Sequence, residues 1–142
     1  LIRSVTGVQP RGWISPRGTP STITSELLVK AGYDWHGDAM DDDLPYLETV
    51  DGKSLVAIPL NMEVNDMPLS VRYGNPPSQM LDLFDTTLKW QLEREPGAGM
   101  LDLTAHMVRD LVARAKSYAD VWVCTRDEIA DHVRGFLKSR SA

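Results

Sequence analysis

The chain of 142 residues has one cysteine, no long apolar run and no basic cluster. Because Cys124 stands alone, an internal disulfide and a zinc site built on several cysteines are both excluded. No apolar stretch approaches the roughly 20 residues that cross a bilayer, so we expect no membrane role. The formal charge of −5 argues against a phosphate-backbone partner, and we expect no nucleic-acid binding.

Several familiar signatures are also missing. The sequence has no Ser-His-Asp order, nucleophile elbow, phosphate-binding loop or HExxH pattern. It shows no secretory signal, so we expect a cytoplasmic protein. The first residues lack a methionine and are typical of the end of a helix, as expected for a segment from the middle of a larger protein.

What is present is a globular pattern in which short apolar strands alternate with amphipathic helices. Hydrophobic residues make up 42% of the chain and charged residues 25%, as in soluble domains. The predicted strands cover residues 12–15, 33–36, 54–60, 100–106 and 121–124. The predicted helices begin at Ser21, Asn75, Val108 and Thr125. This alternation predicts an α/β fold with parallel strands, about half a barrel in extent, and residues 1–142 as one part of a single domain.

Gly32 is placed to end the first helix, and Asp51-Gly52 is a turn signal before the strand at 54–60. In the second helix the predicted apolar face holds Met80, Phe84 and Leu88. The last helix is predicted to start with a capping box, residues 125–128, followed by a buried stripe of Ile129, Val133, Phe136 and Leu137.

The predicted strand 100–106 ends on His106. Ligands and catalytic groups gather at the carboxyl ends of parallel strands, and a histidine there can transfer protons near neutral pH. A structural histidine that hydrogen-bonds a neighbouring loop is the alternative, and for a lone histidine it is the commoner one.

Two further segments allow a functional and an ordinary interpretation. Arg11 and Arg17 flank Trp13, and an arginine there could orient a carboxylate or bind an anionic group; solvated loop arginines are the alternative. Asn65 and Asp66 could line a pocket, or could form a polar turn.

Other residues favour structural roles. Residues 34–43 hold five aspartates and a histidine, but without the alternate spacing of a calcium loop, so we expect caps and turns there more than a cation site. Trp90 and Trp122 stand at core-like spacings, and Cys124 reads as a small buried apolar residue.

Taken in order, the motifs resemble the polysaccharide deacetylase-like (NodB-homology) family, in its allantoinase-like and cyclic-imide-hydrolase-like branch. The resemblance runs over nearly the whole chain and rests on residues 11–17, 32–38, 41–46, 58–59, 65–66, 101–106 and 121–129. It implies a deformed (β/α) barrel that hydrolyses C–N bonds of small linear or cyclic amides, or of the N-acetyl groups of sugars. The first family motifs precede this chain, which therefore resembles the C-terminal half.

The resemblance also assigns roles. His106 matches a histidine that protonates the leaving nitrogen, and Arg11 or Arg17 matches the arginine that steadies a catalytic aspartate. Trp13 and Trp35 match aromatic groove walls, and Asn65 and Asp66 are the remaining candidates for substrate binding. The aspartate base and the ligands of a divalent metal such as zinc would lie outside this chain, with no metal ligand in it.

The N-terminal half is therefore the expected partner, without which the chain would be inactive. Association into oligomers is also expected because half a barrel exposes sheet edges. A non-catalytic subunit and a small-ligand binding module are the alternatives to an enzyme. One departure from the family is that residues 107–110 lead straight into a helix, without the usual second histidine and Gly-Arg-Pro loop.

Overall fold

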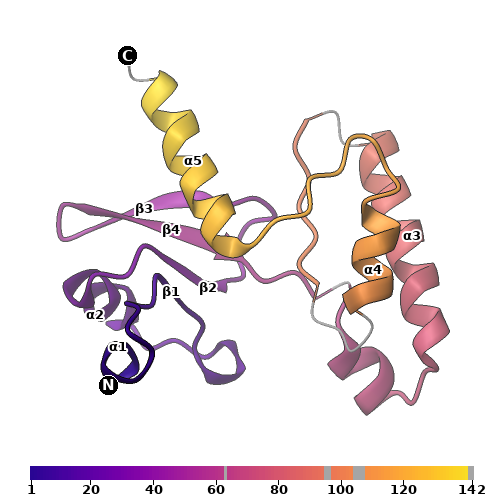
Figure 1. Cartoon of the computed structure of the whole chain (residues 1–142), viewed down its shortest axis with the longest axis horizontal. Coiled ribbons are helices and arrows are strands. Elements are labelled where there is room, and N and C mark those ends of the chain that lie inside the picture. The colour runs from indigo at the N-terminus through magenta and orange to yellow at the C-terminus, as the bar shows by residue number, and fades with distance from the viewer. Residues whose placement is uncertain (63, 95–96, 104–107, 141–142) are drawn as a thin grey trace. The chain divides into compact units, whose positions relative to one another are not determined.

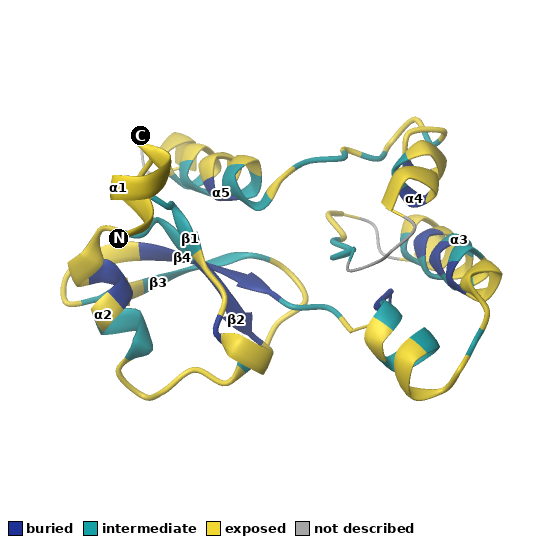
Figure 2. Ribbon diagram, turned by 60° about the horizontal axis from the view of Figure 1, so that its bottom comes forward, coloured by how far each residue is buried: buried dark blue, intermediate teal, exposed yellow. Residues whose placement is uncertain are grey.

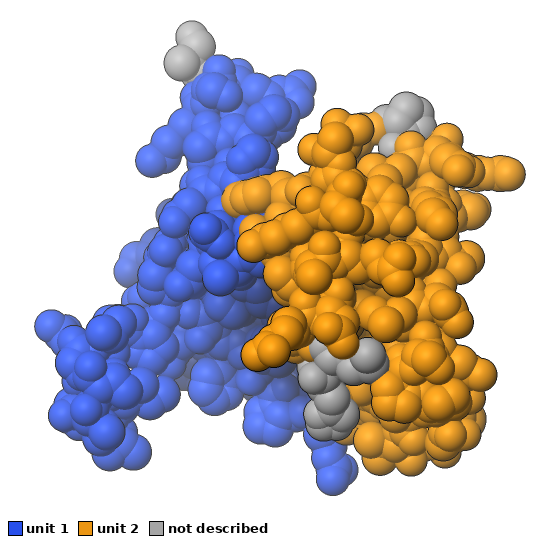
Figure 3. Space-filling model, turned by 45° about the vertical axis from the view of Figure 1, so that its right-hand side comes forward, with its two compact units in different colours: residues 1–60, 124–142 blue, residues 61–123 orange. Residues whose placement is uncertain are grey.

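The computed structural model describes residues 1–62, 64–94, 97–103 and 108–140. The chain divides into two compact units, one formed by residues 1–60 with 124–142 and the other by residues 61–123 (Figure 3). Each unit has its own buried cluster of apolar residues. Their membership of one catalytic domain stays a prediction.

The first unit is built on a four-stranded sheet in the order β1-β2-β4-β3 (Figure 1). Its strands are β1 (Gly12–Trp13), β2 (Trp35–Ala39), β3 (Tyr46–Val50) and β4 (Lys53–Pro59). Strands β1, β2 and β4 are parallel, as predicted, whereas β3 pairs antiparallel with β4 and was not predicted. The tight turn of this hairpin is formed by Asp51 and Gly52, both at positive φ, as a two-residue hairpin turn requires.

The sheet carries helices on both faces. Helix α2 (Thr24–Ala31) packs Leu28 and Val29 against Leu55 of β4, and it ends at Gly32 in the left-handed conformation, as predicted. Ser21 does not cap it: the helix begins three residues later, because Ser21 instead bonds the Thr24 side chain.

Helix α5 (Arg126–Arg140) covers the other face and starts with the predicted capping box. The Thr125 main-chain N–H donates to Glu128 Oε2 at 2.6 Å, and the Glu128 N–H donates to Thr125 Oγ1 at 3.3 Å. The predicted buried stripe is only partly realised, since Ala130 is the buried residue of the described helix and Phe136 is 53% exposed. A short helix α1 (Ile2–Thr6) precedes the sheet.

The second unit is helical. It contains η2 (Met67–Arg72), α3 (Pro77–Arg94) and α4 (Val108–Ala115). The predicted apolar spacing holds: Met80, Phe84 and Leu88 of α3 are buried with Leu111 and Ala115 of α4. Figure 2 shows buried segments in both α3 and α4.

Two predicted strands are not formed where the structure describes them. Residues 100–103 and 121–124 are irregular, because a strand needs a neighbouring strand for its hydrogen bonds. In the first of these segments, side chains bond the main chain instead. The Asp102 N–H donates to Asn61 Oδ1 at 3.2 Å, and Gln91 Nε2 donates to the Met100 carbonyl at 3.4 Å.

Three side chains are less buried than predicted. Trp90 and Trp122 are 53% and 57% exposed, so neither is a core residue of the described structure. Cys124 is half-buried, and this burial raises the pKa of its thiol. Among the described residues, none of the helices is both long and apolar enough to cross a membrane.

Candidate functional site

At the carboxyl ends of β1 and β2, two hydrogen bonds hold the Asp38 carboxylate in place. Asp38 of β2 accepts the Ser15 N–H at 2.7 Å with Oδ1 and the Ser15 hydroxyl at 2.7 Å with Oδ2. Ser15 Oγ in turn accepts the Trp13 indole N–H at 3.2 Å. Since Ser15 and Asp38 are both buried, these bonds pin the segment after β1 against β2.

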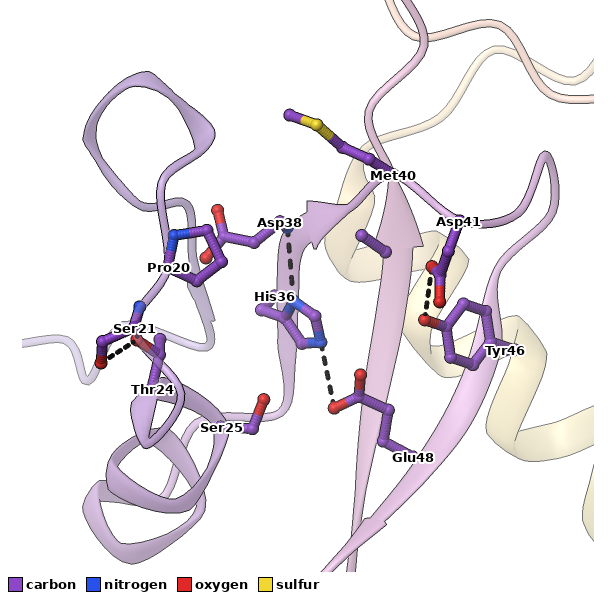
Figure 4. A pocket seen from close by; sticks show the side chains of 11 residues that line it. Pro20, Ser21, Thr24, Ser25, His36, Asp38, Met40, Asp41, Tyr46 and Glu48 are labelled. Carbon is purple, nitrogen blue, oxygen red and sulfur yellow. Dashed lines mark hydrogen bonds and ion pairs between the residues drawn. The ribbon is translucent and has the colours of Figure 1, made fainter.

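A polar pocket of about 230 Å³ opens on the same face of the sheet (Figure 4). Its acidic and aromatic lining comes from β2, β3 and the segment between them, namely His36, Asp38, Asp41, Tyr46 and Glu48. Hydroxyl groups at and before the start of α2 complete it, from Ser21, Thr24 and Ser25.

His36 is the buried centre of this pocket, with 6% of its surface exposed. Its Nδ1 accepts the Asp38 N–H at 3.3 Å, so in the neutral ring the proton is on Nε2. Nε2 lies 3.3 Å from Glu48 Oε2, within ion-pair distance. That contact lacks hydrogen-bond alignment, and within the described part of the chain Nε2 has no hydrogen-bond partner.

Tyr46 and Asp41 close the pocket on the side of the hairpin. The Tyr46 hydroxyl donates to Asp41 Oδ1 at 2.9 Å. Burial, with this hydrogen bond as the next cause, raises the pKa of Tyr46 to about 12. Tyr46 therefore stays a neutral hydrogen-bonding group throughout the physiological range.

Arg11 lies at the opposite, amino edge of the sheet. Its Nε donates to Asp34 Oδ2 at 2.7 Å and its Nη2 to Asp131 Oδ1 at 2.6 Å. Arg134 Nη1 contacts the second Asp34 oxygen at 3.2 Å. The Arg11 hydrogen bonds lower the pKa of Asp131 and raise that of Arg11 itself, so this network ties α5 to the sheet.

Arg17 lies on the carboxyl side of β1, in the 3-10 turn η1 (Pro16–Gly18) that follows it. It is exposed and has a φ of 61°, a rare conformation for a residue with a side chain. The predicted arginine role stays a prediction for both residues, but only Arg17 follows a strand end.

The two predicted groove tryptophans lie on opposite faces of the sheet. Register pairs Gly12 with Trp35 and Trp13 with His36, and parallel partners share a face. Trp35 packs over Gly12, lies under the Arg126 guanidinium and donates its indole N–H to Asp127. The structure does not bring Trp13 and Trp35 together as one groove.

The remaining predicted residues are dispersed. Asn65 and Asp66 belong to the second unit, where Asn65 Oδ1 accepts the Met67 N–H at 2.9 Å as a local turn. Their predicted role in substrate binding is untested. His106 lies outside the described residues, as does residue 63.

No three histidine, cysteine, aspartate or glutamate side chains of the described chain converge as a metal-binding group. The described residues thus do not form a metal centre by themselves, and a metal held by residues outside this chain stays a prediction. In the acidic segment, Asp42 Oδ1 accepts the N–H groups of Asp43 and Leu44, which is the predicted turn role.

Sequence reasoning missed Ser15, His36 and Asp38. The signal was available, because His36 and Asp38 alternate along one strand and so share a face. Because a run of aspartates follows, residues 34–43 were interpreted together as a loop of caps and turns.

The chain is similar to one group of known proteins, although no family model matches it. It is 32% identical over 97 residues to a peptidoglycan deacetylase of Helicobacter pylori, an alignment of 68% of this chain and 31% of that protein. The chain thus spans less than a third of this curated relative.

Solved structures share its fold. A crystal structure assigned as a polysaccharide deacetylase from Mycobacterium smegmatis has a TM-score of 0.79 and 27% identity, over 94% of this chain and 52% of that one. PuuE allantoinase has a TM-score of 0.76 and 24% identity, over 92% and 48%. The predicted α/β fold, half of a deformed (β/α) barrel, is confirmed. The resemblance to the polysaccharide deacetylase-like (NodB-homology) family, predicted from the ordered motifs, is confirmed over the part of these relatives that the chain spans.

Proposed function

We propose that the chain is part of a hydrolase that cleaves an amide C–N bond, with the N-acetyl group of a sugar as the favoured substrate. The observation that carries this proposal is the 32% identity to a peptidoglycan deacetylase over 97 residues. Small cyclic amides are the broader alternative, because an allantoinase shares the fold. The reaction is attack of water on the amide carbonyl, followed by departure of the amine.

Within this reaction, His106 would protonate the leaving nitrogen as the tetrahedral intermediate collapses. Arg17 is the better placed arginine to steady a carboxylate, because it follows β1 whereas Arg11 is held at the other edge by Asp34 and Asp131. The Ser15–Asp38 bonds support this arrangement, since they fix the segment that leads to Arg17. The base would come from the N-terminal half, the proposed partner.

The test measures acetate release from peptidoglycan and from N-acetylglucosamine oligomers, with allantoin and cyclic imides assayed alongside. The full-length protein is used, with the N-terminal half present. We expect His106→Ala to lower the rate by a factor of about 10²–10⁴, as loss of a general acid does. His132→Ala, on the exposed surface of α5, is the matched control and should keep the rate.

An unchanged rate in His106→Ala would contradict the proposed role of that residue. Absence of hydrolysis of every substrate by the wild-type protein would favour a non-catalytic subunit instead.

A further inference from the structure

Ser15 and Asp38 form a buried pair that joins the segment after β1 to the end of β2. Asp38 accepts the Ser15 main-chain N–H and the Ser15 hydroxyl, each at 2.7 Å. Only 6% of Ser15 and 8% of Asp38 is exposed, so water cannot easily replace these bonds. The Trp13 indole N–H donates to Ser15 Oγ at 3.2 Å, so the Ser15 hydroxyl both donates and accepts.

The turn that follows Ser15 has a conformation that its residues rarely adopt. Arg17 and Gly18 have φ values of 61° and 62°, and the first of these is unfavourable because Arg17 has a Cβ. The Gly18 N–H closes the turn by donating to the Ser15 carbonyl at 2.9 Å. Strained backbone of this kind persists where surrounding contacts over-determine it, and it is typical of functional sites. Ser15 is the residue through which the turn is anchored to β2.

The position of Arg17 depends on this anchored turn. Arg17 follows β1 at the carboxyl edge of the parallel strands, where catalytic groups gather. Its side chain is exposed, and the guanidinium bonds to no other residue in the described part of the chain. Because no neighbouring side chain holds the guanidinium, the main chain of the turn determines where it can reach.

We propose that Asp38 is a positioning residue for the proposed amide hydrolysis, and that it acts through Ser15 to hold Arg17 at the edge of the sheet. This inference rests on the proposed function, because the position of Arg17 matters only if Arg17 takes part in the reaction. Asp38 touches no reacting atom: its carboxylate fixes Ser15, Ser15 anchors the turn, and the turn orients Arg17. Removal of the Asp38 charge should therefore lower the rate only as far as Arg17 contributes to it.

Asp38→Asn tests first whether Asp38 holds the turn. The amide keeps the size of the carboxylate but has one acceptor oxygen, so it cannot accept the two Ser15 bonds on separate oxygens. Backbone carbon chemical shifts, from NMR of the full-length protein, report the left-handed conformation of Arg17. We expect them to change in Asp38→Asn, and to change less in Ser15→Ala, which removes only the hydroxyl bond. Asp43→Asn, the same substitution in an exposed loop, is the matched control and should leave them unchanged.

A double-mutant cycle then tests whether Asp38 acts through Arg17. Acetate release from N-acetylglucosamine oligomers is measured for full-length Asp38→Asn, Arg17→Gln and the double variant. We expect each single variant to lower kcat at least about fivefold while KM changes less than about twofold, and the double variant to be no slower than Arg17→Gln. If Asp38 only stabilised the fold, the two losses would multiply.

Unchanged Arg17 shifts in Asp38→Asn would overturn the inference, and so would multiplied losses in the double variant. Ser15→Ala carries both measurements if Asp38→Asn fails to fold. If the wild-type protein hydrolysed no substrate, the proposed function would fail, and the Arg17 shifts would still decide whether Asp38 holds the turn.

Discussion

At the scale of single residues, glycine sets how closely the layers of the first unit approach. A Cβ at Gly12 would collide with the Trp35 ring, and a Cβ at Gly37 would collide with the Arg126 side chain. Gly135 of α5 has open space around its Cα instead. Close packing therefore requires glycine at positions 12 and 37 but not at position 135.

We expect Gly12→Ala to destabilise the protein by about 1–3 kcal/mol, because the Trp35 ring must leave its position. Gly135→Ala, the matched control, should stabilise it by up to about 1 kcal/mol through helix propensity. Urea unfolding measures both free energies. Equal effects of the two substitutions would show that the contact with Trp35 does not limit this position.

At the scale of elements, α5 is attached to the sheet by charge as well as by apolar contact. Arg11 bonds to Asp34 before β2 and to Asp131 on the helix, and Arg134 reaches the main-chain oxygen of Asp34 at 2.6 Å. These groups are partly exposed, with 36% of the Arg11 side chain and 61% of the Asp131 side chain accessible. Solvent and salt therefore weaken the attachment.

The lowered pKa of Asp131 predicts how this attachment depends on pH. A carboxylate whose pKa is lower in the folded state stabilises the fold above its unfolded pKa, and that contribution is lost as the pH falls through the folded pKa. Between about pH 5 and pH 2, we expect the free energy of unfolding of Asp131→Asn to fall less steeply than that of the wild type. Asp43→Asn, in the exposed loop, should follow the wild-type curve. Parallel curves for all three proteins, from urea unfolding at each pH, would refute the role of Asp131.

At the scale of the whole molecule, the two units have separate cores. One cluster joins Leu28, Val29 and Leu55, and the other centres on Phe84 and Leu111. No residue is shared between the two clusters of the described chain.

We expect Leu111→Ala to cost the second unit about 2–5 kcal/mol, the usual range for a fully buried leucine. Amide hydrogen exchange should accelerate in α3 and α4, while protection in β2 and β4 is retained. Uniform acceleration over both units would show that they unfold together.

The sequence predicted correctly those features that neighbouring residues determine, and it failed where a feature needs a partner far along the chain. The capping box at Thr125, the Gly32 helix end and the turn at Asp51–Gly52 are local, and all three were predicted correctly. The strands at 100–103 and 121–124 were not, because apolar alternation cannot supply the neighbouring strand that a strand requires.

The site followed the same rule. The roles of Arg11 and Arg17 stay predictions, and the edge of the sheet on which each lies depends on whether it precedes or follows β1. The burial of His36 and its contact with Glu48 depend on β3, which no sequence signal predicted.

The alternation along β2 has a consequence for how such proteins could diversify. Trp35 and Gly37 serve the contact with α5, whereas His36 and Asp38 serve the pocket. Substitutions at the second pair would change the lining of the pocket, while the first pair preserves the contact between β2 and α5. Insertion of one residue in this strand would turn each pair of side chains to the opposite face of the sheet and disrupt both the contact with α5 and the pocket. We therefore expect such proteins to vary at β2 by substitution and not by insertion.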